Sequence, residues 1–389
     1  MKHHHPRLID PYVIWFASIQ GIAPEKKIKL HKVVESVQSI YQLSEEELLQ
    51  LNSFFDHPLT EIEMTCLREA QTQTQDDIIH MIDALDTHKI RFVPWNSPKY
   101  PQKLLKIASP PYALFYKGNL PQEDQASAAI IGARSCTPYG ETQALEFSES
   151  LAANDVQVIS GLAYGIDGFG HRGALHGKGT TFAVLGCGVD TCYPRSNIGL
   201  YSNILEAKGG ILSEYPPGTP PLSYHFPQRN RIISALSDVV LVIEAKEKSG
   251  SLITVDVALE QGKEVFALPG PIHSKLSQGC NQLIRQGAGI LLSTEQLFED
   301  MGVVHELWEC YTQKHKKKKR KTQKDSINSS DLGTEATILS HIYDSPVSTE
   351  QLFEKCNIPI QELLSKLVTL SIKGFIREHG RGSYVRIMY

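Results

Sequence analysis

Glycines, cationic side chains and hydroxyl side chains follow several of the short apolar runs in this sequence. A glycine lets a ligand approach the backbone closely, an arginine offers a planar fork that suits a phosphate, and exposed N–H groups at a helix start attract anions. Segments of this composition together predict an anion-binding cradle, and they lie at 132–135, 160–171, 186–190, 226–231 and 246–251.

One of these segments favours a particular kind of anion. Phe226 lies close to Arg229 and Arg231, and an aromatic face beside guanidinium groups suits a stacked base with its phosphate nearby. The alternative interpretation places Phe226 in the hydrophobic core, and the sequence leaves both open.

Asp167 and His171 are four residues apart, so on a helix they share a face and could form an acid–base pair. The blander interpretation is that Asp167 caps the helix and His171 bonds Asp167 or a neighbouring backbone group, and we favour it. We therefore predict no catalytic residue, and no nucleophile motif of the Gly-x-Ser-x-Gly type is present.

Nucleotide cofactors and metals are poorly supported. Gly186 and Gly188 are followed by Thr191 where a dinucleotide fingerprint needs its third glycine, and the segment 173–178 is one residue too short for a phosphate loop. The seven cysteines are odd in number and contain no Cys-x-x-Cys pair, which argues against a disulfide framework and a structural zinc site. We predict no cofactor, no metal and a cytoplasmic location, with no membrane span.

The cradle requires a scaffold that brings strand ends together. Apolar runs that are hydrophobic at every position indicate strands buried on both faces, and the amphipathic stretches between them indicate crossover helices. We predict an α/β fold with a Rossmann-like, doubly wound, mostly parallel sheet, whose strands lie near 128–131, 156–159, 181–185, 210–212, 239–243, 265–268 and 290–292.

The remaining segments flank this sheet. Three helical patterns and a hairpin with a glycine turn end the chain, which is typical of a winged helix. The predicted organisation is an N-terminal helical domain like a SAM or helix-hairpin-helix unit (1–75), an extended connector packing on the core (76–125), the Rossmann-like domain (126–305), a basic polar linker (306–334) and a winged-helix-like domain (335–389).

Charge is distributed unevenly along the chain. The net charge is −4, but the run from Lys314 to Lys321 holds seven of the 39 lysines and arginines, which leaves 32 cations against 43 acids elsewhere. Any anion-binding surface on the sheet domain must therefore be local. The basic run could lengthen a DNA footprint or be a solvated linker.

A set of motifs covers the sheet domain in order. They include Ile131-Gly132-Ala133-Arg134, Ser160-Gly161-Leu162-Ala163, Ser213-Glu214-Tyr215-Pro216-Pro217-Gly218, Phe226-Pro227-Gln228-Arg229-Asn230-Arg231 and Ser249-Gly250-Ser251-Leu252-Ile253-Thr254. With these motifs the chain resembles the DNA-processing protein A (DprA, also called Smf) family. The family commonly has an arginine where this chain has Tyr164.

The resemblance implies a binder of single-stranded DNA and not an enzyme. It implies a homodimer formed through the Rossmann-like domain, which protects incoming single strands and loads the recombinase RecA onto them during natural transformation. The residues that it implies for the strand are Gly132, Arg134, Ser135, Ser160, Gly161, Ala163, Tyr164, Phe226, Arg229, Asn230, Arg231, Lys248, Ser249, Gly250 and Ser251.

Two rival functions remain at this stage. One is a nucleotide-processing or phosphosugar-processing enzyme on the same sheet, with Asp167 and His171 as catalysts. The other is a regulator whose winged helix reads duplex DNA, although the last unit offers few cations for that task, such as Lys366 and Lys373.

Overall fold

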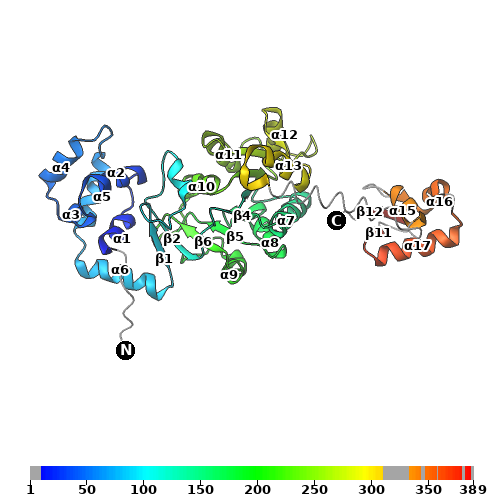
Figure 1. Cartoon of the computed structure of the whole chain (residues 1–389), viewed down its shortest axis with the longest axis horizontal. Helices are drawn as coiled ribbons and strands as arrows, with labels where there is room; N and C mark the ends of the chain where they lie inside the picture. The colour runs from blue at the N-terminus through cyan, green and yellow to red at the C-terminus, as the bar shows by residue number, and fades with distance from the viewer. Residues whose placement is uncertain (1–9, 310–332, 343–346, 357, 379–381, 387–389) are drawn as a thin grey trace. The chain divides into compact units, whose positions relative to one another are not determined.

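The chain forms two compact units, residues 1–312 and residues 313–389 (Figure 1). A computed structural model describes residues 10–309, 333–342, 347–356, 358–378 and 382–386. The basic run from Lys314 to Lys321 lies outside the described residues.

Short helices make up the N-terminal part of the first unit. Several begin with capping boxes, in which a Ser or Thr side chain and a carboxylate three residues later satisfy each other's free amides. The box of Ser44 and Glu47, predicted from the sequence, is confirmed. The helices are α1 (Pro11–Ser18), α2 (Pro24–Val33), α3 (Val37–Gln42), α4 (Glu45–Ser53), α5 (Glu61–Gln71) and α6 (Gln75–Thr87).

A nine-stranded sheet forms the body of this unit, in the order β1-β2-β6-β5-β4-β3-β7-β8-β9. Its strands from β3 onward are parallel, and β1 and β2 pair antiparallel at one edge. The strands are β1 (Arg91–Pro94), β2 (Ala113–Gly118), β3 (Ser127–Ile131), β4 (Gln157–Ser160), β5 (Thr181–Val184), β6 (Gly210–Ser213), β7 (Val239–Val242), β8 (Glu264–Ala267) and β9 (Gly289–Ile290).

The predicted Rossmann-like, mostly parallel sheet is confirmed. Residues 76–125, expected as an extended connector, contribute helix α6, the short 3-10 helix η1 (Gln102–Lys106) and the two antiparallel strands. This segment therefore supplies part of the sheet itself.

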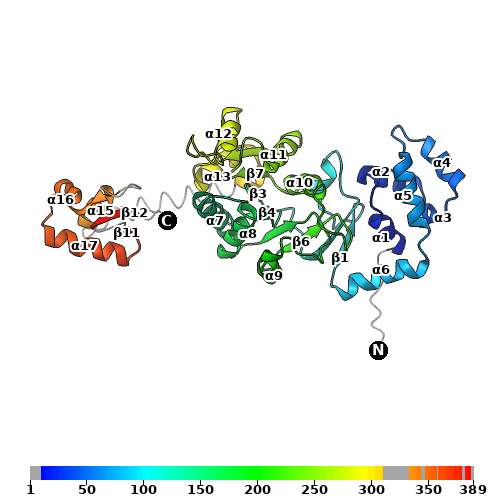
Figure 2. The ribbon, with the colours of Figure 1, turned by 180° about the vertical axis from the view of Figure 1, so that it is seen from behind.

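Helices cover the sheet on both faces (Figures 1 and 2). Alternation along β3 shows why both faces are apolar: Ala129 and Ile131 pack into the core on one side, and Ala128 and Ile130 into the core on the other. The helices that follow β3 are α7 (Pro138–Ala153), α8 (Ile166–His176), α9 (Ile198–Glu206), α10 (His225–Leu236), α11 (Gly250–Glu260), α12 (Gln278–Arg285) and α13 (Thr294–Val304), with the 3-10 helix η2 (Arg195–Asn197) before α9.

The strand order reverses next to β3. The chain winds outward from β3 through β4 and β5 to β6, and then returns to place β7 on the other side of β3. The loops after β3 and β7 therefore leave the sheet in opposite directions and open a crevice between them, which is where ligands of such sheets bind.

The second unit has the predicted winged-helix composition of three helices and a small antiparallel sheet. Its core includes Leu352, Leu363 and Leu367. The elements are α15 (Gly333–Ser340), β10 (Val347–Ser348), α16 (Thr349–Cys356), α17 (Ile360–Ile372), β11 (Ile376–Glu378) and β12 (Ser383–Arg386).

Candidate nucleic-acid interface

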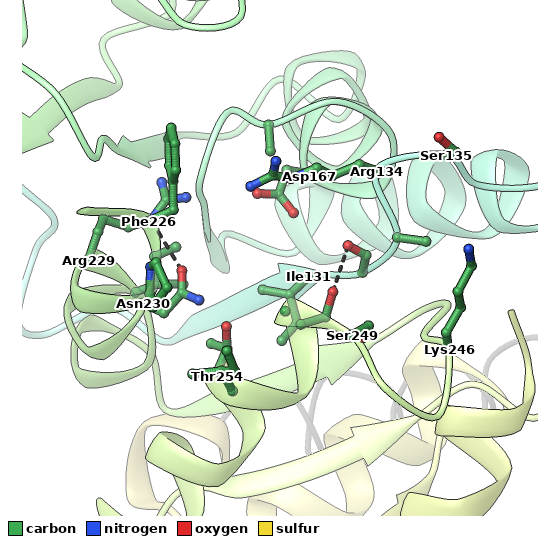
Figure 3. A pocket seen from close by; sticks show the side chains of 18 of the residues that line it. Ile131, Arg134, Ser135, Asp167, Phe226, Arg229, Asn230, Lys246, Ser249 and Thr254 are labelled. Carbon is green, nitrogen blue, oxygen red and sulfur yellow. Dashed lines mark hydrogen bonds between the residues drawn. The ribbon is translucent and has the colours of Figure 1, made fainter. Parts of the chain in front are cut away.

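A cavity of about 380 Å³ lies beyond the carboxyl ends of β3 and β7. We call it the first cavity (Figure 3). Four of the five segments that the sequence singled out contribute to its lining: the loops after β3, β4 and β7 and the start of α10. The segment 186–190 contributes no lining residue, so the predicted convergence is confirmed for four segments and not for the fifth.

The loop after β3 is held close to the end of β7. Ala133 donates its amide to the carbonyl of Glu244 at 2.7 Å, and a Cβ at Gly132 would lie 2.9 Å from that carbonyl oxygen. The Glu244 carboxylate accepts hydrogen bonds from the amide and hydroxyl of Thr137, which caps α7. A buried carboxylate thus fixes the start of the helix behind the loop, and Arg134 and Ser135 extend exposed side chains at the mouth.

Arg134 leaves the loop toward α10. Its guanidinium carbon lies 5.4 Å from the centre of the Phe226 ring, and the Phe226 ring lies 5.5 Å from that of Tyr193. Phe226 lines the cavity with its side chain half-buried. Phe226 is therefore not among the buried core residues, and its stacking on a base stays a prediction.

Arg229 is built into the wall. Its side chain is only 4% exposed, and its guanidinium donates to the carbonyls of Gly161, at 2.9 Å, and Val184. A Cβ at Gly161 would lie 2.6 Å from the guanidinium nitrogens. The glycine is therefore required for Arg229 to reach the end of β4.

Arg231 does not line the first cavity. Successive residues of a helix are rotated by about 100°, so two residues apart they point to nearly opposite sides. Arg229 faces the first cavity, whereas Arg231 pairs with Glu214 at 2.6 Å and lines a separate cavity. The sequence predicted that Arg229 and Arg231 would contact the same DNA strand, but the structure places them at different cavities.

The loop after β7 closes the remaining side. Lys246 lines the cavity with an exposed side chain, whereas Lys248, which the sequence favoured, is not among its lining residues. Ser251 donates to the carbonyl of Gly132 at 2.8 Å and joins this loop to the loop after β3. The hydroxyl of Ser249 is buried and has no hydrogen-bond partner among the described residues, so it remains available as a donor for a ligand.

The other predicted residues divide into lining and supporting positions. Ala163, Asn230 and Gly250 line the cavity. Ser160 is buried and donates to the carbonyl of Ile130, so it holds β4 to β3 and contacts no ligand space. Tyr164 is half-exposed beside Ala163 but does not line the cavity.

Some lining residues were not predicted as strand contacts. Ser223 and Thr254 line the cavity and lie outside the predicted anion-binding segments, whereas Lys246 lies within the predicted segment 246–251 but not among the predicted strand contacts. The signal for Lys246 was present, because it lies two residues beyond Glu244 at the end of a predicted strand.

The lining carries an excess of positive charge. It includes Arg134, Arg229 and Lys246 against the carboxylate of Asp167. Burial raises the pKa of Asp167, an effect that the positive charge of Arg229 opposes, and Asp167 also accepts the Gly161 amide at 3.2 Å. The acid therefore serves to hold the loop after β4.

Asp167 and His171 do not form a catalytic pair at this cavity. His171 is fully buried, its Nδ1 bonds the hydroxyl of Thr181 at 2.6 Å, and it is not among the lining residues. Burial lowers the pKa of His171 to about 3. The geometry favours structural roles for both residues, but not the predicted ones. The N-cap of α8 is Gly165, without a side-chain hydrogen bond, so Asp167 does not cap the helix, and His171 bonds the side chain of Thr181 instead of Asp167 or a backbone group.

Neither a metal site nor a membrane span is found in the described residues. Across the described part of the chain, no group of three or more His, Cys, Asp or Glu side chains is arranged to hold a metal ion. Over the same residues, no helix combines the length and apolar character that a bilayer crossing needs.

Comparison with known families gives two matches along the chain. A family model for DNA recombination-mediator protein A matches residues 91–302, and a model for the DprA winged helix domain matches residues 323–382. Protein Smf of Escherichia coli K12 is 39% identical over 300 residues, which cover 76% of this chain and 77% of that protein. DNA processing protein DprA of Bacillus subtilis 168 is 39% identical over 243 residues, which cover 62% and 81%.

Two solved structures share the fold. DNA processing protein A from Streptococcus pneumoniae superposes with a TM-score of 0.60 at 34% identity, covering 73% of this chain and 95% of that one. DNA processing protein A from Helicobacter pylori gives a TM-score of 0.50 at 30% identity, covering 55% and 97%. The latter structure is described as showing a unique mode of single-stranded DNA binding.

Proposed function

This chain belongs to the DNA recombination-mediator protein A (DprA) family, and from that premise we propose that it binds single-stranded DNA in the first cavity, with little sequence preference. The support is the described binding of a single strand by the Helicobacter pylori relative and the convergence of unpaired donors in this cavity. The proposed activity is binding and protection of the strand, without turnover.

A single observation carries the proposal: the exposed guanidinium of Arg134 lies over the ring of Phe226 at the mouth of a positively charged cavity. A phosphate can accept from Arg134 while the neighbouring base stacks on the aromatic side. Both contacts tolerate any base, because every nucleotide has a phosphate and a flat face.

The other contacts follow from the geometry of the loops. Ser249 offers its unpartnered hydroxyl, Lys246 offers an exposed charge, and Ser135 lies beside Arg134 at the mouth. Gly250 has open space where a Cβ would lie and lets a ligand backbone approach closely, and Gly132, Asn230 and Ala163 border the same cavity. Arg229 acts from within the wall, where its charge attracts phosphate although its hydrogen bonds are made to the protein.

Partners beyond DNA are also proposed. We place the protein in the reducing cytoplasm, which agrees with the free thiols of the described cysteines, and we propose that it delivers the strand to RecA during natural transformation. The homodimer would use the β9 edge of the sheet, where Ile290 and Leu292 expose apolar side chains.

The winged helix is proposed as an accessory module that does not read duplex DNA. On α17 the exposed apolar side chains include Leu364, Val368 and Ile372. The helix cation Lys366 and the adjacent Lys373 both pair with Glu335. A recognition helix needs free cations and polar groups for the groove, so this face suits a protein contact better.

A binding titration tests the proposed function. We expect labelled oligo-dT to bind the parent protein tightly, a matched duplex and free nucleotides to bind weakly, and Arg134→Ala to weaken oligo-dT binding about tenfold, which corresponds to the loss of one charge-assisted contact of about 1.4 kcal/mol. Binding of the duplex in preference to oligo-dT, or affinity unchanged by Arg134→Ala, would contradict the proposal. A RecA assembly assay on protein-coated single strands tests the delivery step separately.

A further inference from the structure

A second and larger cavity, of about 620 Å³, lies on the other side of α10. We call it the second cavity. One wall comes from the N-terminal helices, with the turn between α1 and α2 and with Glu63 of α5. The opposite wall comes from β2, the segment after β6 and the face of α10 that carries Arg231.

The charged groups that line the second cavity are all bonded to other groups of the protein, and Glu25 accepts from the hydroxyl of Ser109 at 2.7 Å. Arg231 forms a two-pronged contact with Glu214, at 2.9 Å and 2.6 Å. Lys27 is buried and donates to the carbonyls of Ala17, at 3.0 Å, and Ile19. Glu63 accepts from Lys26 at 2.6 Å and from the amide of Ala23 at 3.2 Å.

This pairing disfavours phosphate. The charged lining consists of the cations Lys27 and Arg231 against the acids Glu25, Glu63 and Glu214. The amide of Ala23, in the turn between α1 and α2, already donates to the carboxylate of Glu63. The part of a ligand that occupies this cavity should therefore be uncharged.

The uncharged lining suits a flat ring with a hydrogen-bonding edge. The rings of Tyr215 and His225 stack with their centres 3.9 Å apart, and Tyr224 stands at the rim with 58% of its surface exposed. Gln20 and Gln228 contribute amide groups, bonded to Thr219 and Tyr215. Aromatic faces combined with amides are the groups that recognise unstacked bases.

The two cavities meet at the first turn of α10. Ser223 lines the first and Tyr224, the next residue, lines the second. Phe226, on the first side, is two residues from Tyr224. A strand whose phosphates lie in the first cavity can therefore turn a neighbouring base over the start of α10 without leaving the protein surface.

We propose that the second cavity receives one base of the bound single strand, while the flanking phosphates stay at the positive first cavity. This inference rests on the proposed function and extends it, because it adds a base-binding subsite at the junction of the helical and sheet domains. It also assigns Arg231 and Glu214 a role in shaping that subsite.

The experiment compares an oligo-dT with an abasic deoxyribose-phosphate oligomer of the same length, using the full-length protein. We expect Tyr224→Ala to weaken oligo-dT binding about fivefold or more, as the loss of one stacked base does, and to leave abasic-oligomer binding unchanged. Tyr139→Ala is the matched control, because Tyr139 is also exposed but lines neither cavity. Equal losses on both oligomers, or no loss on oligo-dT, would overturn the inference.

Photocrosslinking supplies a second readout that does not depend on a variant. Oligo-dT carrying 5-iodouracil is irradiated with the parent protein, and we expect the crosslinked peptides to contain Tyr224, Tyr215 or His225. Crosslinks confined to Phe226 and Tyr193 would overturn the subsite and leave the proposed function standing. Failure of the parent to bind oligo-dT at all would overturn both.

Discussion

The two cavities on either side of α10 use charge in opposite ways. In the first cavity Arg134 and Lys246 extend exposed cationic side chains, and the acid in the lining, Asp167, is tied to a backbone amide. In the second cavity, Arg231 and Lys27 are held by a carboxylate or by backbone carbonyls. The two cavities contain similar charged side chains, and they differ mainly in whether the cations are paired with acceptors of the protein.

The difference arises within a short stretch of one helix. Arg229 and Arg231 are separated by a single residue and are identical in chemistry, yet the helical rotation sends one to each side. Arg229 is enclosed by the ends of β4 and β5, whereas Arg231 meets Glu214 beyond β6. An arginine's role here is therefore set by its helical position and its acceptors.

The largest expected effect is on stability, and it separates the two arginines. Arg229→Ala removes the donor for the carbonyls of Gly161 and Val184 and leaves Asp167 without its nearby positive charge. We expect a loss of about 3–5 kcal/mol in the free energy of unfolding. Arg231→Ala, at a partly exposed pair, should cost about 1–2 kcal/mol. Urea unfolding followed by circular dichroism measures both.

Equal losses of stability in the two variants would contradict this prediction. If Arg231→Ala destabilised the protein as much as Arg229→Ala, the pair of Arg231 with Glu214 would be part of the core and not the wall of a ligand site. Arg91→Ala is a suitable control, because Arg91 lies on the edge strand β1 and bonds an exposed carbonyl.

Much of the fold could be predicted because its signal is local. A run such as Val239 to Ile243 is apolar at every position, short and rich in β-branched residues, which favours a strand buried on both faces. The edge strands β1 and β2 were missed as strands. Proline and aromatic residues around them resemble a connector, and their antiparallel pairing with β6 depends on distant partners.

The sequence predicts the site residues that lie in the loops after the strands, because the ends of the strands can be located from the sequence. Gly132 and Arg134 lie just after β3, and Ser249 lies in the loop between β7 and α11, so the sheet topology places them together. The separation of Arg229 from Arg231, and the choice of Lys246 over Lys248, depend on side-chain direction. The second cavity was not foreseen, since it arises where the N-terminal helices meet the sheet domain.

A smaller effect is expected from the buried cation of the second cavity. Burial lowers the pKa of Lys27 from 10.5 to about 7, so between these values the unfolded chain binds a proton that the folded protein does not. The contribution of Lys27 to stability should therefore rise with pH across this window, by about 2 kcal/mol between pH 7 and pH 9.

The measurement compares the parent with Lys27→Met by denaturant unfolding at several pH values. The variant removes the titration, so its stability relative to the parent should fall as pH rises from 7 to 9. A difference that stays constant over this range would show that Lys27 remains protonated in the folded protein, and the second cavity would then hold an additional positive charge.

The smallest effect is on the salt dependence of DNA binding, and it compares the two cavities most directly. Each phosphate neutralised on a single strand contributes about −0.7 to the slope of log affinity against log salt. Arg134→Ala and Lys246→Ala should each make the slope less negative by about 0.7. Arg231→Ala should leave the slope unchanged even if it weakens binding, because Arg231 is paired with Glu214 and neutralises no phosphate. A reduced slope for Arg231→Ala would mean that the strand opens this pair and that phosphates enter the second cavity. The two sides of α10 would then share one electrostatic role.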